Sequence, residues 1–164
     1  MHALKLFTGI SMLIFASTVI AAGKVTDERV LAESALGENW FLKGGNFRGE
    51  HYSPLSQINE DNVAELGLAW ASDLPLLDGI ATTPIVIDGV IYISGAYSIV
   101  LAVDASNGKI IWTYDPKVSD AFAEKPELSW ISRASRGVGV FDGHVFATTA
   151  DCRLISINAA TGVH

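Results

Sequence analysis

The stretch AVDASNGKIIW, residues 102–112, carries the clearest structural signal in the chain. An apolar run ending at Asp104 precedes the turn dipeptide Asn107-Gly108, and a second run ends at Trp112. Two such runs around Asn-Gly are typical of a β-hairpin, because these residues tolerate the positive φ of a type I′ turn. The sequence therefore predicts two antiparallel strands joined by a type I′ turn at Asn107-Gly108. Trp112 would bury its large ring against a neighbouring sheet.

The same pattern starts again 54 positions later, where residues 156–164 read SINAATGVH. The register holds without a gap. The matching pairs are Asp88-Gly89 and Asp142-Gly143, Tyr92 and Phe146, Ser94 and Thr148, Val103 and Ile157, Asp104 and Asn158, Ala105 and Ala159, and Gly108 and Gly162. Internal repetition at this length indicates a propeller or a solenoid. Chance similarity of two β-hairpins is the alternative.

Four strand-like segments fill the first repeat, at residues 83–87, 90–94, 99–104 and 109–114. Four short antiparallel strands form a self-contained sheet, which in outline is one propeller blade. Upstream, the patterns predict a helix at 26–37, a helical turn at 59–66 and a further strand at 66–71. The predicted fold class is all-β: a β-propeller fragment of about two four-stranded blades, with short N-terminal helices, that stops inside a blade.

The first 22 residues have the pattern of a secretory signal peptide. Lys5 precedes an apolar run at 6–20, and small residues follow at the expected cleavage point. An uncleaved N-terminal anchor is the alternative, although the run is short for a membrane span. We therefore expect a signal peptide at 1–22, an N-terminal cap at 23–66 and a partial propeller at 67–164. The chain would be exported, to the periplasm in a bacterium, with no transmembrane span beyond the signal peptide.

The charge and the cysteine count exclude several functions. Cleavage after residue 22 would leave about 142 residues. It would also remove Lys5, so that 10 of the 11 basic side chains would remain against 18 acidic ones. An acidic chain without a basic stripe argues against nucleic-acid partners. Cys152 is the single cysteine, which rules out an intrachain disulfide and a cysteine-cluster metal site. We predict no metal-ligand set in this chain, since His51 and His144 have no ligand-spaced neighbours.

Two groups of residues resemble the pyrroloquinoline quinone (PQQ) dehydrogenases. The stretch 102–112 resembles their tryptophan-docking motif. The N-terminal positions that resemble their opening signature are Asn39-Trp40, Gly44-Gly45, His51-Tyr52-Ser53-Pro54-Leu55, Gln57-Ile58-Asn59, Asn62-Val63 and Leu66. The resemblance spans about residues 38–164. It implies an eight-bladed propeller that oxidises an alcohol or an aldose. PQQ would lie in the central channel, with calcium polarising its reactive carbonyl and an Asp as general base.

Three candidate cofactor-binding residues follow from the resemblance. Arg136 matches the Arg that pairs with a PQQ carboxylate, and Ser135 stands where the family usually has Asn. Trp130-Ile131 take the places of two adjacent cysteines of the alcohol-oxidising branch, so Trp130 is a candidate to stack on the quinone. Ala81 replaces a Glu that contacts PQQ in that branch. The alternatives are a solvent-facing Arg136 and a Trp130 packed under the 115–133 connection.

The sequence thus predicts the N-terminal part of an exported PQQ- and calcium-dependent dehydrogenase acting on an alcohol, with a periplasmic electron acceptor. No catalytic residue is predicted within the chain, because the resemblance places the calcium ligands, the catalytic Asp and most PQQ contacts beyond His164. This chain alone would therefore be inactive, would bind neither group tightly, and would self-associate through exposed edge strands. Two alternatives stay open: a non-catalytic envelope scaffold, and a truncated or decayed gene product.

Overall fold

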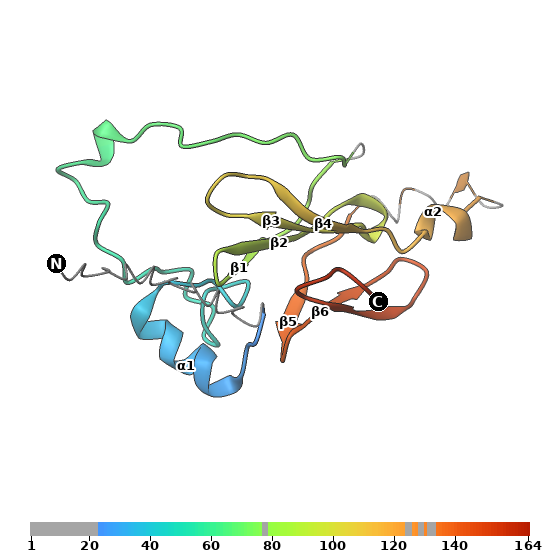
Figure 1. The fold of residues 1–164 in the computed structure, drawn as a ribbon, viewed down its shortest axis with the longest axis horizontal. Coiled ribbons are helices and arrows are strands. Elements are labelled where there is room, and N and C mark those ends of the chain that lie inside the picture. Colours follow the sequence, from blue (N-terminus) through green and yellow to red (C-terminus); the bar gives the residue numbers. More distant parts are fainter. Residues whose placement is uncertain (1–22, 77–78, 124–125, 128–129, 131–133) are drawn as a thin grey trace, which may run out of the picture.

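Two antiparallel sheets lie side by side in the computed structural model (Figure 1), which describes residues 23–164 except 77–78, 124–125, 128–129 and 131–133. The first sheet has the order β1-β2-β3-β4, with β1 at Ile85–Ile87, β2 at Val90–Ser94, β3 at Val100–Asp104 and β4 at Ile110–Tyr114. The second has the order β5-β6-β7, with β5 at Gly139–Phe141, β6 at His144–Thr148 and β7 at Leu154–Asn158. The all-β prediction is confirmed, and the four predicted strands of the first sheet are correct to within two residues.

The predicted N-terminal helix is also confirmed, as α1 at Asp27–Leu36. The Thr26 hydroxyl accepts a hydrogen bond from the Arg29 backbone N–H at 3.3 Å, and Gly37 ends the helix in the left-handed conformation. The helical turn predicted at 59–66 is the short 3₁₀ helix η1, Val63–Glu65. Two further short helices are η2 at Ala96–Ser98 and α2 at Val118–Ala121.

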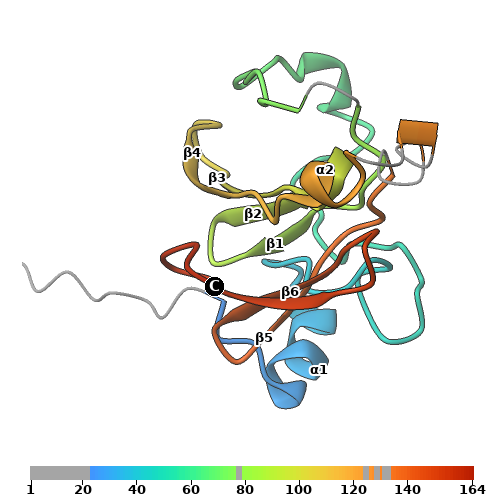
Figure 2. The same ribbon diagram turned by 90° about the vertical axis from the view of Figure 1, so that its right-hand side faces the viewer.

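The segment that precedes α1 is fixed on the second sheet. The backbone N–H groups of Asp142 and Gly143 donate to the carbonyl oxygens of Val25 and Gly23 at 3.0 and 2.9 Å. This places α1 beside β5, as Figure 2 shows. The predicted signal peptide lies outside the described residues. Within the described ranges, no helix is long and apolar enough to cross a bilayer.

The hairpin turns depart from the prediction in one place. Asp88-Gly89 and Asp142-Gly143 both have positive φ at each residue, as a type I′ turn requires. At Asn107-Gly108 only Gly108 has a positive φ, so the predicted type I′ turn is wrong. The reason is Asp104, whose carboxylate accepts hydrogen bonds from the Ser106 backbone N–H at 2.8 Å and the Asn107 side chain at 2.8 Å. These bonds stabilise a longer turn, which closes where the Gly108 N–H donates to the Asp104 carbonyl.

The strand predicted at 66–71 is also wrong, because this segment is irregular in the structure. Leu68 is 85% exposed, and no strand in the described part of the chain pairs with the segment. Without a partner the backbone groups of an extended segment have no ladder to join. Trp70 nevertheless anchors it, since its indole N–H donates to the Ala105 carbonyl at 3.0 Å.

One apolar core joins the two sheets and the N-terminal cap. Its buried members are Val25, Val30, Phe41, Ile85, Ile87, Tyr92, Val100, Ala102, Trp112, Val140, Val145, Ala147, Ile155, Ile157 and Ala159. Tyr92 is completely buried, and Trp112 is 9% exposed between the sheets. Each sheet thus buries an apolar face against the other, as expected when a single sheet cannot cover its own apolar face.

Candidate functional site

A pocket of about 290 Å³ lies where loops from the two sheets meet. Its walls are the end of η2, the segment that enters β5, and the turn that follows β6. The lining residues are Ser98, Ala134, Ser135, Arg136, Gly137, Thr148, Thr149 and Ala150. The structure thus brings two predicted cofactor-binding residues, Ser135 and Arg136, into one pocket. Arg136 is exposed, so its guanidinium is open to a ligand.

Hydroxyl groups fix the Ser135 side of the pocket. Ser135, which is 8% exposed, donates from Oγ to the Oγ of Ser94 at 2.8 Å. Ser94 is completely buried and lies 3.1 Å from the Thr82 hydroxyl. Ala81, which replaces the expected Glu, directly precedes this chain of hydroxyls. The Ala81 methyl group supplies no polar contact there.

The η2 wall adopts an unusual backbone conformation. Tyr97 and Ser98 both have φ of 58°, in the left-handed region that non-glycine residues rarely occupy. Gly95 closes this turn by donating its N–H to the Ile99 carbonyl at 2.8 Å. Ser98 is buried at the pocket edge, and residues held this way are frequent at ligand sites.

The third wall is the turn after β6. The buried Thr149 hydroxyl hydrogen-bonds the Asp151 carboxylate and accepts from the Arg153 backbone N–H at 3.0 Å. Hydrogen bonds from the Arg153 guanidinium hold the pKa of the Asp151 carboxyl below its usual range. The carboxylate therefore stays ionised near neutral pH, with Arg153 as its partner.

Trp130 is not among the described residues that line the pocket, and its side chain is 67% exposed. Ile131 lies outside the described residues. Ser98, Thr148 and Thr149 are lining residues that the sequence analysis missed. The available signal was the repeat register, which matches Ser94 at the end of β2 with Thr148 at the end of β6. Of this pair, Thr148 lines the pocket and Ser94 hydrogen-bonds a lining residue, Ser135.

No three His, Cys, Asp or Glu side chains gather as a metal site would need in the described parts of the chain. Cys152 is exposed and forms no disulfide.

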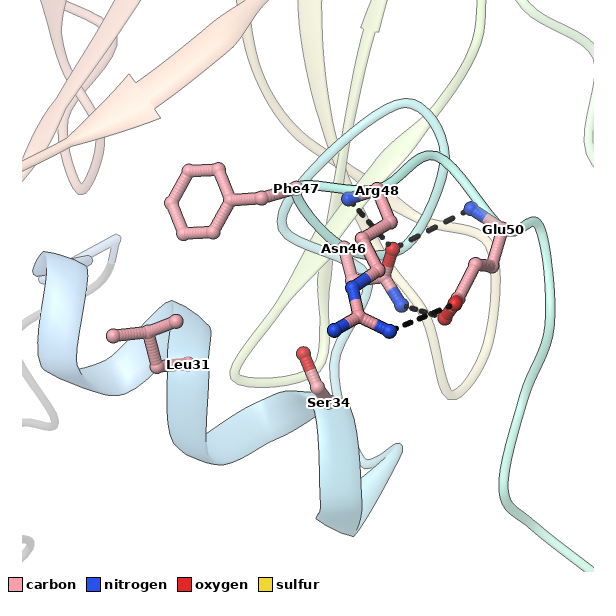
Figure 3. A pocket seen from close by; sticks show the side chains of 6 residues that line it. All are labelled: Leu31, Ser34, Asn46, Phe47, Arg48 and Glu50. Atoms are coloured by element: carbon pink, nitrogen blue, oxygen red, sulfur yellow. Dashed lines mark hydrogen bonds and ion pairs between the residues drawn. The ribbon is translucent and has the colours of Figure 1, made fainter.

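A second hollow, of about 310 Å³, lies between α1 and the loop at 46–50 (Figure 3). Leu31 and Phe47 are exposed on its sides, at 64% and 62%. Arg48 and Glu50, both from the 46–50 loop, form an ion pair of 3.7 Å. None of the predicted site residues lines this hollow, and its charged groups satisfy one another.

The neighbouring four-stranded and three-stranded sheets, docked through a buried Trp, have the arrangement of adjacent blades of a β-propeller. The family model described as "Glucose/ethanol/alcohol dehydrogenase, beta-propeller domain", the PQQ family, matches residues 40–164. The chain belongs to this family.

Relatives in the family are alcohol dehydrogenases by name. The chain is 42% identical over 154 residues to "1-butanol dehydrogenase (cytochrome c)" of Thauera butanivorans, covering 94% of this chain and 20% of the relative. It is 41% identical over 138 residues to the quinohemoprotein alcohol dehydrogenase ADH-IIG of Pseudomonas putida, covering 84% and 19%.

Solved structures of alcohol dehydrogenases also resemble this chain. The quinohemoprotein alcohol dehydrogenase of Comamonas testosteroni superimposes with a TM-score of 0.77 and 36% identity, covering 87% of this chain and 21% of that one. A europium-containing methanol dehydrogenase gives a TM-score of 0.67 and 28% identity, covering 84% and 24%. The chain therefore spans about a fifth of the length of the relatives it matches.

Proposed function

We propose that this chain is the N-terminal part of an exported, PQQ- and calcium-dependent dehydrogenase that oxidises an alcohol. One observation carries the proposal: Ser135 and Arg136 line a single pocket with three further hydroxyl-bearing residues, in a chain of the PQQ family. The chain supplies one part of the quinone site and requires the rest of an eight-bladed propeller for turnover. The 54-residue pattern is, in this proposal, the blade repeat.

The donor set in the pocket fits a carboxylate-bearing quinone. A guanidinium forms paired, charge-assisted hydrogen bonds with a carboxylate, and Arg136 is the exposed cation of this pocket. Ser98, Thr148 and Thr149, which carry hydroxyl groups, line the same pocket. At Gly137, where φ is 131°, an added Cβ would meet the Thr83 carbonyl oxygen at 3.3 Å. The backbone next to Arg136 therefore passes close to Thr83.

Each residue of the pocket has a binding role in this proposal. Arg136 neutralises a carboxylate of the cofactor, and Ser135 is held in place by Ser94. When bound, PQQ supplies the two-electron oxidation of the alcohol, which protein side chains cannot perform. The calcium ligands, the general base and the remaining PQQ contacts come, in this proposal, from other parts of the protein.

The electron acceptor and the location are proposed from the relatives. The name of the Thauera butanivorans relative specifies cytochrome c, so we propose a cytochrome as the acceptor here. The predicted signal peptide at 1–22 would place the protein in the periplasm, where such an acceptor is accessible.

A non-catalytic scaffold is the second candidate, and two observations favour it. Ala81 offers no polar group beside the hydroxyl chain, and Trp130 is 67% exposed rather than part of the pocket wall. Both positions differ from the alcohol-oxidising pattern.

Titration of the full-length gene product with PQQ in the presence of calcium separates these functions. Wild-type protein should bind the quinone and oxidise a primary alcohol in a dye-linked assay. Arg136→Ala should weaken PQQ binding by about 10- to 100-fold, since a hydrogen bond to a charged partner contributes about 1.5–3 kcal/mol. Arg48→Ala, which removes an exposed Arg in the other hollow, is the matched control. Binding that is equal in wild type and Arg136→Ala, or absent in wild type, would contradict the proposal.

The role of Trp130 has its own test. If its ring stacks on the quinone, Trp130→Ala should reduce the quenching of protein fluorescence that PQQ causes. Equal quenching in the variant and in wild type would remove Trp130 from the site.

A further inference from the structure

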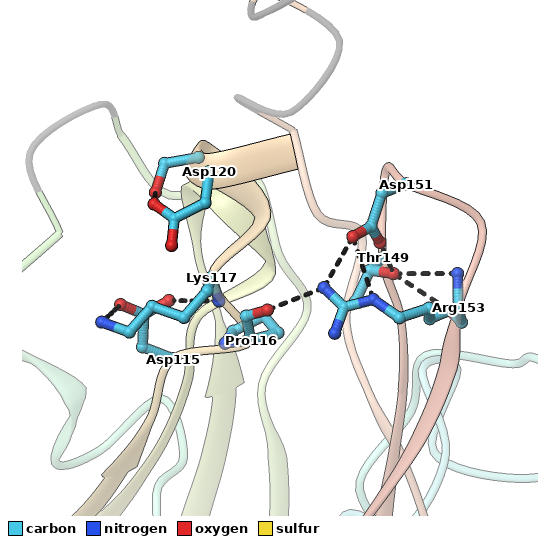
Figure 4. Close-up of polar contacts among 8 residues, drawn as sticks. Asp115, Pro116, Lys117, Asp120, Thr149, Asp151 and Arg153 are labelled. Atoms are coloured by element: carbon cyan, nitrogen blue, oxygen red, sulfur yellow. Dashed lines mark hydrogen bonds and ion pairs between the residues drawn. The ribbon is translucent and has the colours of Figure 1, made fainter. Parts of the chain in front are cut away.

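Arg153 connects the two sheets at the end where the pocket lies (Figure 4). Its Nη2 donates a hydrogen bond of 2.7 Å to the backbone carbonyl oxygen of Pro116, just after β4 of the first sheet. The same guanidinium donates to the Asp151 Oδ2 from Nε at 2.9 Å and from Nη2 at 2.6 Å. A planar fork of donors can hold a carboxylate and a carbonyl together, which a lysine ammonium does less well.

The β6–β7 turn that carries Arg153 is itself a wall of the pocket. Thr149 lines the pocket, and its hydroxyl hydrogen-bonds the Asp151 carboxylate. The Thr149 backbone N–H donates to the Arg153 carbonyl at 2.9 Å, which closes the turn. Cys152, at the tip, has φ of 68°, so the turn has a conformation that these bonds must maintain.

Pro116 lies at the start of the connection between β4 and β5, and the end of this connection lines the pocket at Ser135 and Arg136. After Pro116 the chain forms α2, where Val118 is completely buried and α2 packs against η2. Ser98 of η2 lines the pocket, and the connection returns to it at Ser135 and Arg136. The start of the connection is thus held between the η2 wall and Arg153.

We infer that Arg153, supported by Asp151, is a positioning residue of the quinone pocket. Through Pro116 and α2 it fixes the separation between the η2 wall, which carries Ser98, and the wall formed by Thr148 to Ala150. This inference rests on the proposed function for the identity of the ligand, but the link between the walls is a property of the protein alone. Arg153 does not line the pocket, so it acts through the residues that do.

Two measurements on the full-length gene product test the inference. In the absence of PQQ, Arg153→Ala should speed amide hydrogen exchange at residues 96–99 of the η2 wall and at 148–150. In PQQ titrations the same variant should weaken binding by about 2- to 30-fold, the range expected for a residue that acts from outside a site. Arg48→Ala is the matched control, because it removes an exposed Arg whose ion pair with Glu50, at 3.7 Å, lies within one loop and does not join the sheets.

Two further variants separate positioning from general stability. Arg153→Lys should recover part of the affinity, because one of the two partners can still be bound. In Ser98→Ala protein, the Arg153→Ala change should have a smaller effect on PQQ affinity, since a side chain of the wall that it positions is gone.

Exchange at 96–99 and 148–150 that is equal in Arg153→Ala and wild type would overturn the inference, whether or not the quinone binds. Faster exchange with unchanged PQQ affinity would overturn the positioning role. A wild-type protein that does not bind PQQ would instead refute the proposed function, and the exchange data would still decide whether Arg153 ties the two walls together.

Discussion

The indole Nε1 of Trp112, in the last strand of the first sheet, donates a 2.9 Å hydrogen bond to the backbone carbonyl oxygen of Ala159 in the second sheet. The Tyr92 hydroxyl donates to the same oxygen at 3.3 Å. Trp70 has the corresponding relationship to the first sheet, since its Nε1 donates to the Ala105 carbonyl at 3.0 Å. Ala105 and Ala159 are 54 positions apart, so the same backbone site on each sheet receives the indole of the segment before it.

Two replacements of Trp112 should distinguish the contribution of its hydrogen bond to stability from that of its buried ring. Trp112→Phe keeps most of the buried ring and should cost about 1–2 kcal/mol of unfolding free energy, because the Ala159 carbonyl loses a donor. Trp112→Ala should cost about 3–5 kcal/mol, as expected for a large ring removed from a core. Chemical denaturation of the full-length gene product measures both. Trp130→Ala, at a 67% exposed position, is the control and should change little. A Trp112→Ala protein as stable as that control would contradict the docking role.

A glycine should be required at position 162, because the Trp112 ring packs against it. Its φ is 72°, and a Cβ there would meet Trp112 atoms at 2.8 Å. Gly143 has a similar φ of 79° but nothing within 4 Å, so Gly143→Ala reports the backbone strain alone. Gly162→Ala should therefore be more destabilising than Gly143→Ala, by about 1–3 kcal/mol for the overpacking. The difference should shrink when Trp112 is already Ala. Equal losses of unfolding free energy in Gly162→Ala and Gly143→Ala would show that the Trp112 ring can move aside for the added methyl group without loss of stability.

The strands were predictable from sequence because their signals are local. Asp88-Gly89 and Asp142-Gly143 between β-branched runs specify tight turns by their own conformational preferences. The conformation of Asn107-Gly108 was not predictable in this way, because the Asp104 carboxylate competes for the same backbone N–H groups. A dipeptide signal is overridden when a preceding side chain can cap the turn.

The strand expected at 66–71 shows a different limit. Its residues have strand character, and Trp70 docks as Trp112 does, but a strand also needs a neighbour to pair with. Sequence patterns contain no information on whether that neighbour is present. For the pocket, the resemblance led to Ser135 and Arg136, whereas Ser98 is placed there by the positive φ of η2, which no propensity at Tyr97-Ser98 would indicate.

Stability should fall at alkaline pH because of Tyr92. Burial, with a contribution from the negative charge of Asp88, raises the pKa of the Tyr92 hydroxyl to about 12. Its unfolded pKa is about 10. The unfolded chain therefore loses this proton first, so the stabilisation is complete below pH 10 and is lost as the pH rises toward 12. The slope should approach about 1.4 kcal/mol per pH unit in that interval. Unfolding free energies from pH 8 to 12 test this, and Tyr92→Phe should remove this part of the slope. An unchanged slope in the variant would assign it to other groups.

The ion pair that fixes α1 should contribute more than an ordinary surface pair. The Arg29 guanidinium forms a two-pronged contact with the Asp88 carboxylate in the β1–β2 turn, and the Asp88 side chain is 14% exposed. This hydrogen bond is the main reason that the pKa of Arg29 is raised. The Arg29 guanidinium also lies 5.1 Å above the Phe41 ring. The Asp88 backbone N–H donates to the Asn39 side chain at 2.7 Å, so the carboxylate belongs to a fixed turn.

Arg29→Ala should therefore lower the unfolding free energy by about 1–2 kcal/mol, below the full value of a charged hydrogen bond because the pair is partly exposed. The matched control is Arg48→Ala, whose ion pair with Glu50 is longer, at 3.7 Å, and has an Arg side chain that is 86% exposed. That change should stay within about 0.5 kcal/mol. Arg29→Lys should recover only part of the loss, because an ammonium cannot reproduce the two-pronged contact. Equal effects of Arg29→Ala and Arg48→Ala in denaturation experiments would show that α1 is held by its apolar contacts alone.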